Sequence, residues 1–127
     1  MSDVPAIDLV ALEPFMDDAA FLGVLIDEFF AEAPRRMSAL RTAYAAGDTS
    51  VLRSEGHALK GSARVFGAAP MAAMCQALET THVVDDATGD WLGQLEGEFE
   101  RVRAALEKTR AEAMERGAGA PSSKETR

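Results

Sequence analysis

The residue best suited to covalent chemistry in this sequence is His57, within the stretch Glu55–Ala68. Imidazole is the side chain that titrates nearest neutrality, and its neutral form is a nucleophile. Read as a helix at about 100° per residue, the stretch places His57 on the side opposite an apolar stripe. That stripe consists of Leu52, Leu59, Ala63 and Phe66. The periodicity therefore predicts an exposed histidine on an amphipathic helix.

Basic residues and a glycine surround the histidine at helical neighbour spacings. These neighbours are Arg53, Lys60, Gly61 and Arg64. A mid-helix glycine costs about 0.5–1 kcal/mol relative to alanine, and one reason to accept that cost is to leave room beside a neighbour. At Gly61 the room would let another protein reach the imidazole. The three cations favour an anion or an acidic partner here, or they form only an ordinary solvated face.

Several motifs in order resemble the histidine phosphotransfer (HPt) domain. His57-Ala58-Leu59-Lys60-Gly61-Ser62 is followed by Gly67-Ala68 and then by Met74-Cys75-Gln76-Ala77-Leu78-Glu79. The family pattern is roughly His-x-Leu-Lys-Gly-Ser, a glycine some ten residues after the histidine, and a helix with Leu/Met-Cys-x-x-Leu-Glu. The resemblance covers about residues 7–113.

The resemblance implies a function and a role for each matching residue. His57 would accept a phosphoryl group from an aspartyl phosphate on a receiver domain and pass it to another receiver, in a multistep phosphorelay. Lys60 would stabilise the charge of the carried group. Glu79 would bond the imidazole and fix its tautomer, or it is only an exposed glutamate at a helix end. Gly61 and Gly67 would act by shape.

The implied partners are receiver domains of response regulators or hybrid histidine kinases. The candidate docking residues around His57 are Arg53, Ala58, Arg64 and Val65, while Ser62 and Ala68 belong to the docking rim or only to helix packing. Mg²⁺ is expected on the receiver domain, and no cofactor on this chain. The chain would be a phosphoryl carrier without kinase or phosphatase activity of its own. The alternative is a helical adaptor or inhibitor that binds a receiver domain or sensor kinase without being phosphorylated.

Other chemistries lack the residues that they need. His82 is the only other histidine, and no Cys/His/acid cluster has the spacing of metal ligands. We expect His82 at a helix C-terminus, where the helix dipole favours a cation. Cys75 lies on the apolar side of its predicted helix and is expected to be a buried hydrophobe. The sequence therefore predicts no metal site and no second nucleophile.

Composition excludes several classes of protein. The 127 residues, 47% of them apolar and 27% charged, suit one globular domain, and the net charge of −8 argues against nucleic-acid binding. The first 34 residues contain no Lys or Arg, so a basic signal peptide is not expected, and no apolar run could span a bilayer. The single cysteine fits a reducing compartment. We expect a cytoplasmic monomer that does not bind membranes.

Apolar spacing predicts an all-α fold, an up-down-up-down antiparallel four-helix bundle with a short N-terminal cover helix. The expected organisation is a flexible N-terminus over 1–6, the bundle over 7–116 and a disordered C-terminal tail over 117–127. The cover helix should end before Pro14, and Pro34 should kink or break the next helix near Ala33. The remaining helices are predicted over about 49–66, 69–83 and 90–115.

Overall fold

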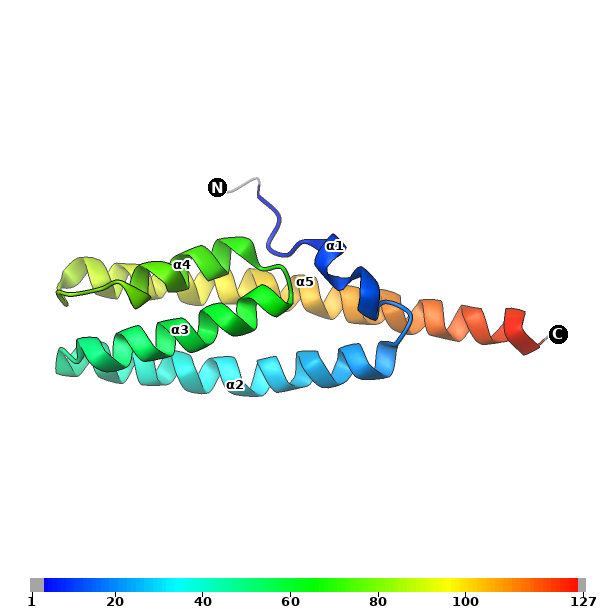
Figure 1. The fold of residues 1–127 in the computed structure, drawn as a ribbon, viewed down its shortest axis with the longest axis horizontal. Helices are drawn as coiled ribbons and strands as arrows, with labels where there is room; N and C mark the ends of the chain where they lie inside the picture. Colours follow the sequence, from blue (N-terminus) through cyan, green and yellow to red (C-terminus); the bar gives the residue numbers. More distant parts are fainter. Residues whose placement is uncertain (1–3, 126–127) are drawn as a thin grey trace.

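Four long helices run alternately up and down through the molecule (Figure 1). They are α2 (Ala19–Ala46), α3 (Thr49–Val65), α4 (Ala69–Glu79) and α5 (Asp86–Glu125), and a short helix α1 (Leu9–Leu12) and a 3₁₀ turn η1 (Glu13–Phe15) precede them. This computed structural model describes residues 4–125, and the side-chain surroundings of residues 4–117. The predicted antiparallel four-helix bundle with an N-terminal cover helix is confirmed.

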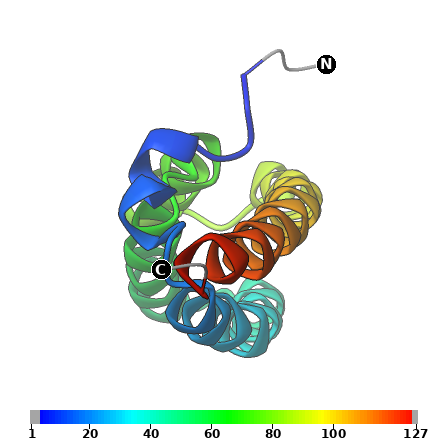
Figure 2. The same cartoon turned by 90° about the vertical axis from the view of Figure 1, so that its right-hand side faces the viewer.

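The core lies between the four long helices, which surround a common centre when viewed along the bundle (Figure 2). Phe29 of α2 packs near its middle, with its ring centroid 5.1 Å from that of Phe66 and 5.5 Å from that of Phe99. Burying a large apolar side chain stabilises the fold by about 1.5–3 kcal/mol. All four residues of the stripe predicted for α3, Leu52, Leu59, Ala63 and Phe66, are buried. Their burial fixes the rotation of α3 and turns His57 outward.

Aspartate side chains cap the N-termini of α2 and α3. Asp18 caps α2 by accepting a hydrogen bond from the Phe21 amide (3.0 Å), and Asp48 caps α3 through the Val51 amide (3.1 Å). Between them, Gly47 ends α2 with a φ of 67° in the left-handed region. The hinge between these two antiparallel helices is therefore built from local sequence alone.

Of the kink or break expected at Pro34, the break does not occur, because α2 continues without interruption from Ala19 to Ala46. Proline inside a helix removes one backbone hydrogen bond, and its ring crowds the carbonyl four residues earlier. Pro34 itself is exposed, whereas the preceding Ala33 is fully buried. Packing of the buried face holds α2 together across this position, so the prediction of a break is wrong.

Helix α4 is shorter than predicted, ending at Glu79 rather than near residue 83. The Thr80 hydroxyl donates to the carbonyl oxygen of Ala77 (3.1 Å), and the Thr81 hydroxyl donates to the same oxygen (3.0 Å). Hydroxyls that bond the last carbonyls of a helix compete with its continuation. His82 therefore lies beyond the helix end and not in its last turn, contrary to the prediction.

Both ends of the chain differ from expectation. Helix α5 begins at Asp86 and continues to Glu125, past the predicted end near residue 115. At the other end, Ala6 is buried, and the Arg101 guanidinium donates to the Val4 carbonyl oxygen (2.7 Å). Residues 4–6 are thus packed on the bundle, while 1–3 and 126–127 lie outside the described residues. None of the helices in the described part of the chain is long and apolar enough to cross a membrane.

Replacing Gly67 with alanine is expected to destabilise the protein by about 2 kcal/mol or more. Gly67 has a φ of 64°, which costs a non-glycine residue about 1–2 kcal/mol, and an added Cβ would lie 2.8 Å from the Cβ of Ala11. Gly47→Ala is the matched control, because its φ is similar but an added Cβ would meet nothing within 4 Å. Urea unfolding measures the free energy of unfolding of both variants. Equal losses of stability would mean that crowding against α1 adds nothing to the cost of alanine at position 67.

Candidate functional site

His57 projects from the outward face of α3, and its side chain is 70% exposed. An added Cβ at Gly61, four residues later, would meet nothing within 4 Å. The open space predicted beside the imidazole is therefore present, and a partner can approach the ring from this side. The ring needs a neighbour to set its tautomer, because a free imidazole can carry its proton on either nitrogen.

The neighbour is Glu79, the last residue of α4. Its Oε2 lies 2.7 Å from Nδ1 of His57. An ionised carboxylate accepts hydrogen bonds and donates none, so Nδ1 is the donor in this contact. In the neutral ring, Nε2 then carries a free lone pair. Of the two predicted roles for Glu79, this geometry agrees with contact to the ring and not with an isolated glutamate at a helix end.

The sequence position of Lys60 suggested an exposed basic stripe beside His57. In the structure Lys60 is not part of such a stripe. Only 11% of its side chain is exposed, and its Nζ donates to Oε1 of Glu79 and to Oε1 of Gln76 (2.8 Å). Sequence analysis missed Gln76, although it stands three residues before Glu79 and so on the same face of α4. Lys60 therefore orients the carboxylate that contacts His57, and two of its three ammonium N–H donors are used within this cluster.

The electrostatics of this cluster keep Glu79 ionised. The hydrogen bond from Lys60 and, second, the hydrogen bond with His57 hold the pKa of the Glu79 carboxyl below its ordinary value of 4.5. A carboxylate with a lowered pKa stabilises the fold above its unfolded pKa and loses that contribution as the pH falls through the lowered value. The contact with His57 is consequently intact throughout the neutral range.

We expect Lys60→Met to return the pKa of Glu79 toward 4.5 by more than His57→Gln does, because the lysine is the larger cause of the lowering. Titration of the Glu79 carboxyl carbon by NMR in the wild type and the two variants measures both changes. A larger return in His57→Gln would contradict this ranking of the two partners.

The predicted docking residues surround the cluster on the protein surface. Arg53, Arg64 and Val65 are exposed, and Ala58 is partly exposed. One shallow hollow beside Glu79 is lined by Thr49, Ser50, Arg53 and Ser54. A second is lined by Arg64, Gln76 and four alanines, Ala68, Ala69, Ala72 and Ala73. Each hollow thus contains one arginine of α3 and one residue of the polar cluster.

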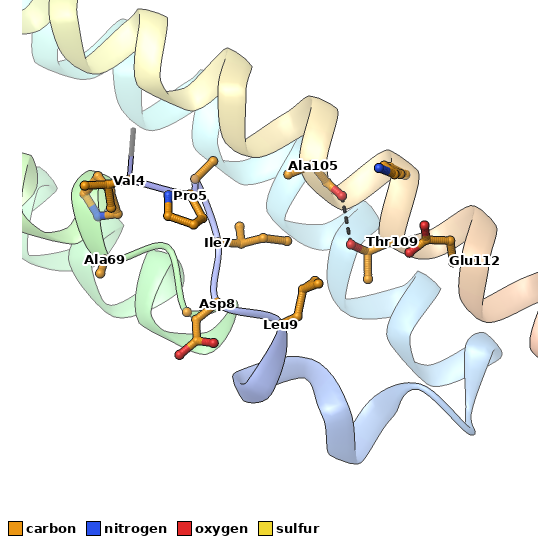
Figure 3. A pocket seen from close by; sticks show the side chains of 13 residues that line it. Val4, Pro5, Ile7, Asp8, Leu9, Ala69, Ala105, Thr109 and Glu112 are labelled. Atoms are coloured by element: carbon orange, nitrogen blue, oxygen red, sulfur yellow. Dashed lines mark hydrogen bonds between the residues drawn. The ribbon is translucent and has the colours of Figure 1, made fainter. Parts of the chain in front are cut away.

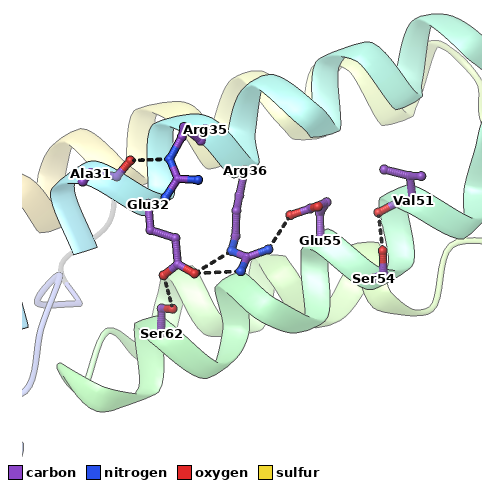
Figure 4. A network of polar contacts seen from close by, with 8 residues as sticks. All are labelled: Ala31, Glu32, Arg35, Arg36, Val51, Ser54, Glu55 and Ser62. Atoms are coloured by element: carbon purple, nitrogen blue, oxygen red, sulfur yellow. Dashed lines mark hydrogen bonds and ion pairs between the residues drawn. The ribbon is translucent and has the colours of Figure 1, made fainter. Parts of the chain in front are cut away.

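Ser62 and Ala68 serve helix packing. The Ser62 hydroxyl donates to Oε1 of Glu32 (3.1 Å) across the α2–α3 contact, and Ala68 is fully buried. The same carboxylate pairs with Arg36, whose guanidinium also pairs with Glu55 (2.9 Å), as Figure 4 shows. Arg36 and Ser62 together hold the pKa of Glu32 below its ordinary value, with Arg36 the larger cause. This network ties α3 to α2 on the side away from Glu79.

Gly67 does not lie at the imidazole but ends α3 against α1, where its carbonyl oxygen accepts a hydrogen bond from the Asp8 amide (2.9 Å). Gly56, which sequence analysis did not single out, lies where α4 packs directly against α3. A signal for it was present, because a glycine inside the apolar stripe of a helix indicates close packing of another backbone.

Other candidate chemistry is absent from the part of the chain that the structure describes. No group of three or more His, Cys, Asp or Glu side chains there could hold a metal ion. Burial raises the pKa of the Cys75 thiol to about 12, so this cysteine is a neutral core residue. An apolar pocket of about 580 Å³ lies away from His57, between the N-terminal segment and α5 (Figure 3). Its lining is mostly apolar, and the Thr109 hydroxyl in it is already bonded to the Ala105 carbonyl (2.9 Å).

Comparisons with known proteins agree with this geometry. The family model described as the Hpt domain matches residues 24–117, which include His57, Lys60 and Glu79. Among solved structures, the chain is similar to histidine-containing phosphotransfer protein B (HptB) from Pseudomonas aeruginosa PAO1, with a TM-score of 0.71 and 26% identity over 87% of this chain and 97% of that one. The comparison with curated proteins gave no match. With its helical bundle and exposed histidine, the chain belongs to the Hpt family of histidine phosphotransfer domains.

Proposed function

We propose that His57 carries a phosphoryl group on Nε2 between the aspartates of receiver domains in a phosphorelay. The observation that supports this most directly is the hydrogen bond between Nδ1 and Glu79, which leaves Nε2 as the free nucleophilic nitrogen of a 70% exposed ring. In the transfer step, the Nε2 lone pair forms a bond to phosphorus. The P–O bond to the donor aspartate breaks, and its electron pair leaves on that carboxylate.

The ring becomes positively charged when Nε2 is phosphorylated, because Nδ1 keeps its proton. Glu79 accepts the hydrogen bond from that nitrogen, so its carboxylate stabilises the charge as it develops. The reverse step restores the neutral ring when a second receiver aspartate takes the phosphoryl group. This chain needs no acid or base of its own, and the divalent cation and the aspartates belong to the receiver.

The receiver would dock over α3 and the two hollows that flank His57. Arg53 and Arg64 supply exposed positive charge on either side of the histidine along α3, in a chain of net charge −8. Oppositely charged surfaces speed association and suppress wrong partners. Val65, 48% exposed, adds apolar area beside this polar centre.

Val65→Glu is expected to weaken receiver binding about tenfold, because it places a charge where an apolar contact is proposed. The matched control is Met114→Glu, which changes a similarly exposed apolar residue on α5. Titration calorimetry with a receiver domain measures the affinity of both variants. If the two variants bind alike, Val65 is not part of the docking surface.

The proposed function is tested by incubating this protein with receiver domains that carry labelled phosphate. We expect label to move to this chain and to be acid-labile and base-stable, as a phosphoramidate is and a phosphoester is not. Transfer onward to a second, unlabelled receiver would complete the relay. If no receiver in a full panel labels the chain despite measurable binding, the relay function is excluded and an adaptor role replaces it.

A further inference from the structure

The carboxylate that contacts His57 stands at a helix end, where backbone hydrogen bonding is incomplete. Glu79 is the last residue of α4 in this structure. Its position therefore depends on what the final turn of α4 packs against. That turn lies on α3, and these two helices share the most extensive helix–helix contact in the bundle.

At Gly56, α4 passes directly against the backbone of α3. A Cβ added at this glycine would lie 3.0 Å from the Cys75 carbonyl oxygen, 3.0 Å from the Leu78 Cβ and 3.2 Å from the Glu79 amide nitrogen. All three distances are shorter than ordinary van der Waals contact, and two of the atoms belong to the backbone, which moves only with the whole helix turn. Any side chain at position 56 would consequently displace the end of α4 by a few tenths of an ångström.

Gly61 provides an internal comparison on the same helix. An added Cβ there would meet nothing within 4 Å, so no packing contact requires a glycine. The two glycines share the same helical backbone and flank the same histidine. Only Gly56 lies under the turn that carries Glu79.

We propose that Gly56 is a positioning residue for phosphoryl transfer, an inference that rests on the proposed function. By letting the last turn of α4 lie directly on α3, it holds the Glu79 carboxylate within 2.7 Å of Nδ1 and so selects the tautomer with a free Nε2. The residue acts through Glu79 and touches neither the imidazole nor the transferred group.

The test makes two measurements on Gly56→Ala, with Gly61→Ala as the control for the first and Gly97→Ala on α5 as the control for the second. The first is the tautomer of the His57 ring, read by ¹⁵N NMR at a pH where the ring is neutral. The second is the rate of labelling by a phosphorylated receiver. We expect Gly56→Ala to lower the population of the Nδ1–H tautomer and to slow transfer about three- to tenfold, since small misplacements of a positioning group reduce rates strongly. Gly61→Ala should retain the wild-type tautomer, and Gly97→Ala, at an exposed position of α5 where an added Cβ also meets nothing within 4 Å, should retain the wild-type rate.

Several results would overturn the proposal. One is a folded Gly56→Ala variant with the wild-type tautomer, whatever its rate. Another is an equal tautomer change in Gly61→Ala. If Gly56→Ala does not fold alone, the double variant Gly56→Ala/Gly61→Ala is compared with Gly61→Ala, because alanine at position 61 strengthens α3. Failure of the proposed function is distinguishable, because the wild type itself would then remain unlabelled while the tautomer change still reports on Gly56.

Discussion

Replacing His57 with glutamine is expected to abolish phosphoryl transfer completely while leaving the fold and receiver binding intact. Glutamine has no nitrogen lone pair that can attack phosphorus, since its amide nitrogen is a donor only. The side chain is 70% exposed, so the free energy of unfolding should change by no more than about 0.5 kcal/mol. Glu79 keeps its hydrogen bond from Lys60 in this variant, and the rest of the cluster remains in place.

The chain offers a matched control in His82→Gln, which removes the only other histidine. His82 is exposed and lies beyond the end of α4, so this variant should accept label at the wild-type rate. The measurements are the initial rate of labelling, thermal unfolding and calorimetric binding to the receiver. Label that persists in His57→Gln, or that disappears in His82→Gln, would contradict the assignment of the acceptor. Loss of receiver binding in His57→Gln would instead make the histidine a docking residue.

The parts of this structure that follow from local sequence were predictable. The apolar stripe of α3 fixed the outward direction of His57. Asp18 determined where α2 begins, and Gly47 and Asp48 determined where α2 ends and α3 begins. Boundaries that depend on side-chain hydroxyls were not predicted, as Thr80 and Thr81 show at the end of α4. Helical periodicity locates faces, whereas the last turn of a helix is decided by single hydrogen bonds.

The candidate site was predictable as a set of residues but not as an arrangement. Spacing along α3 placed Lys60 beside His57 but contained no information on how close α4 would come. That distance depends on Gly56, whose missing side chain lets α4 cover Lys60 and bring Glu79 and Gln76 to it. A basic residue read from one helix as exposed became a buried member of a two-helix cluster. Tertiary packing, rather than spacing, therefore decides what Lys60 does.

The two roles for Lys60 lead to different results in a double-mutant cycle with Glu79. If Lys60 acts only by orienting the carboxylate, Lys60→Met and Glu79→Ala should each slow transfer about tenfold, the rate equivalent of one hydrogen bond. The double variant should then be no slower than either single one, because both changes remove the same positioning contact. If Lys60 instead contacts the phosphoryl group, as the family resemblance suggested, the losses should multiply to about a hundredfold.

The structure favours the first outcome, because Nζ of Lys60 already donates to Glu79 and Gln76 and its side chain is only 11% exposed. Without loss of these bonds, Lys60 has only its third N–H donor to offer a group on Nε2 of His57. Methionine keeps the length and apolar stem of lysine, so Lys60→Met tests the charge with little loss of packing. Lys108→Met, at an exposed position on α5, is the control for removing a positive charge from this acidic protein and should transfer at the wild-type rate. Multiplicative losses in the cycle would return Lys60 to the phosphoryl group and leave Glu79 as the only residue that sets the ring.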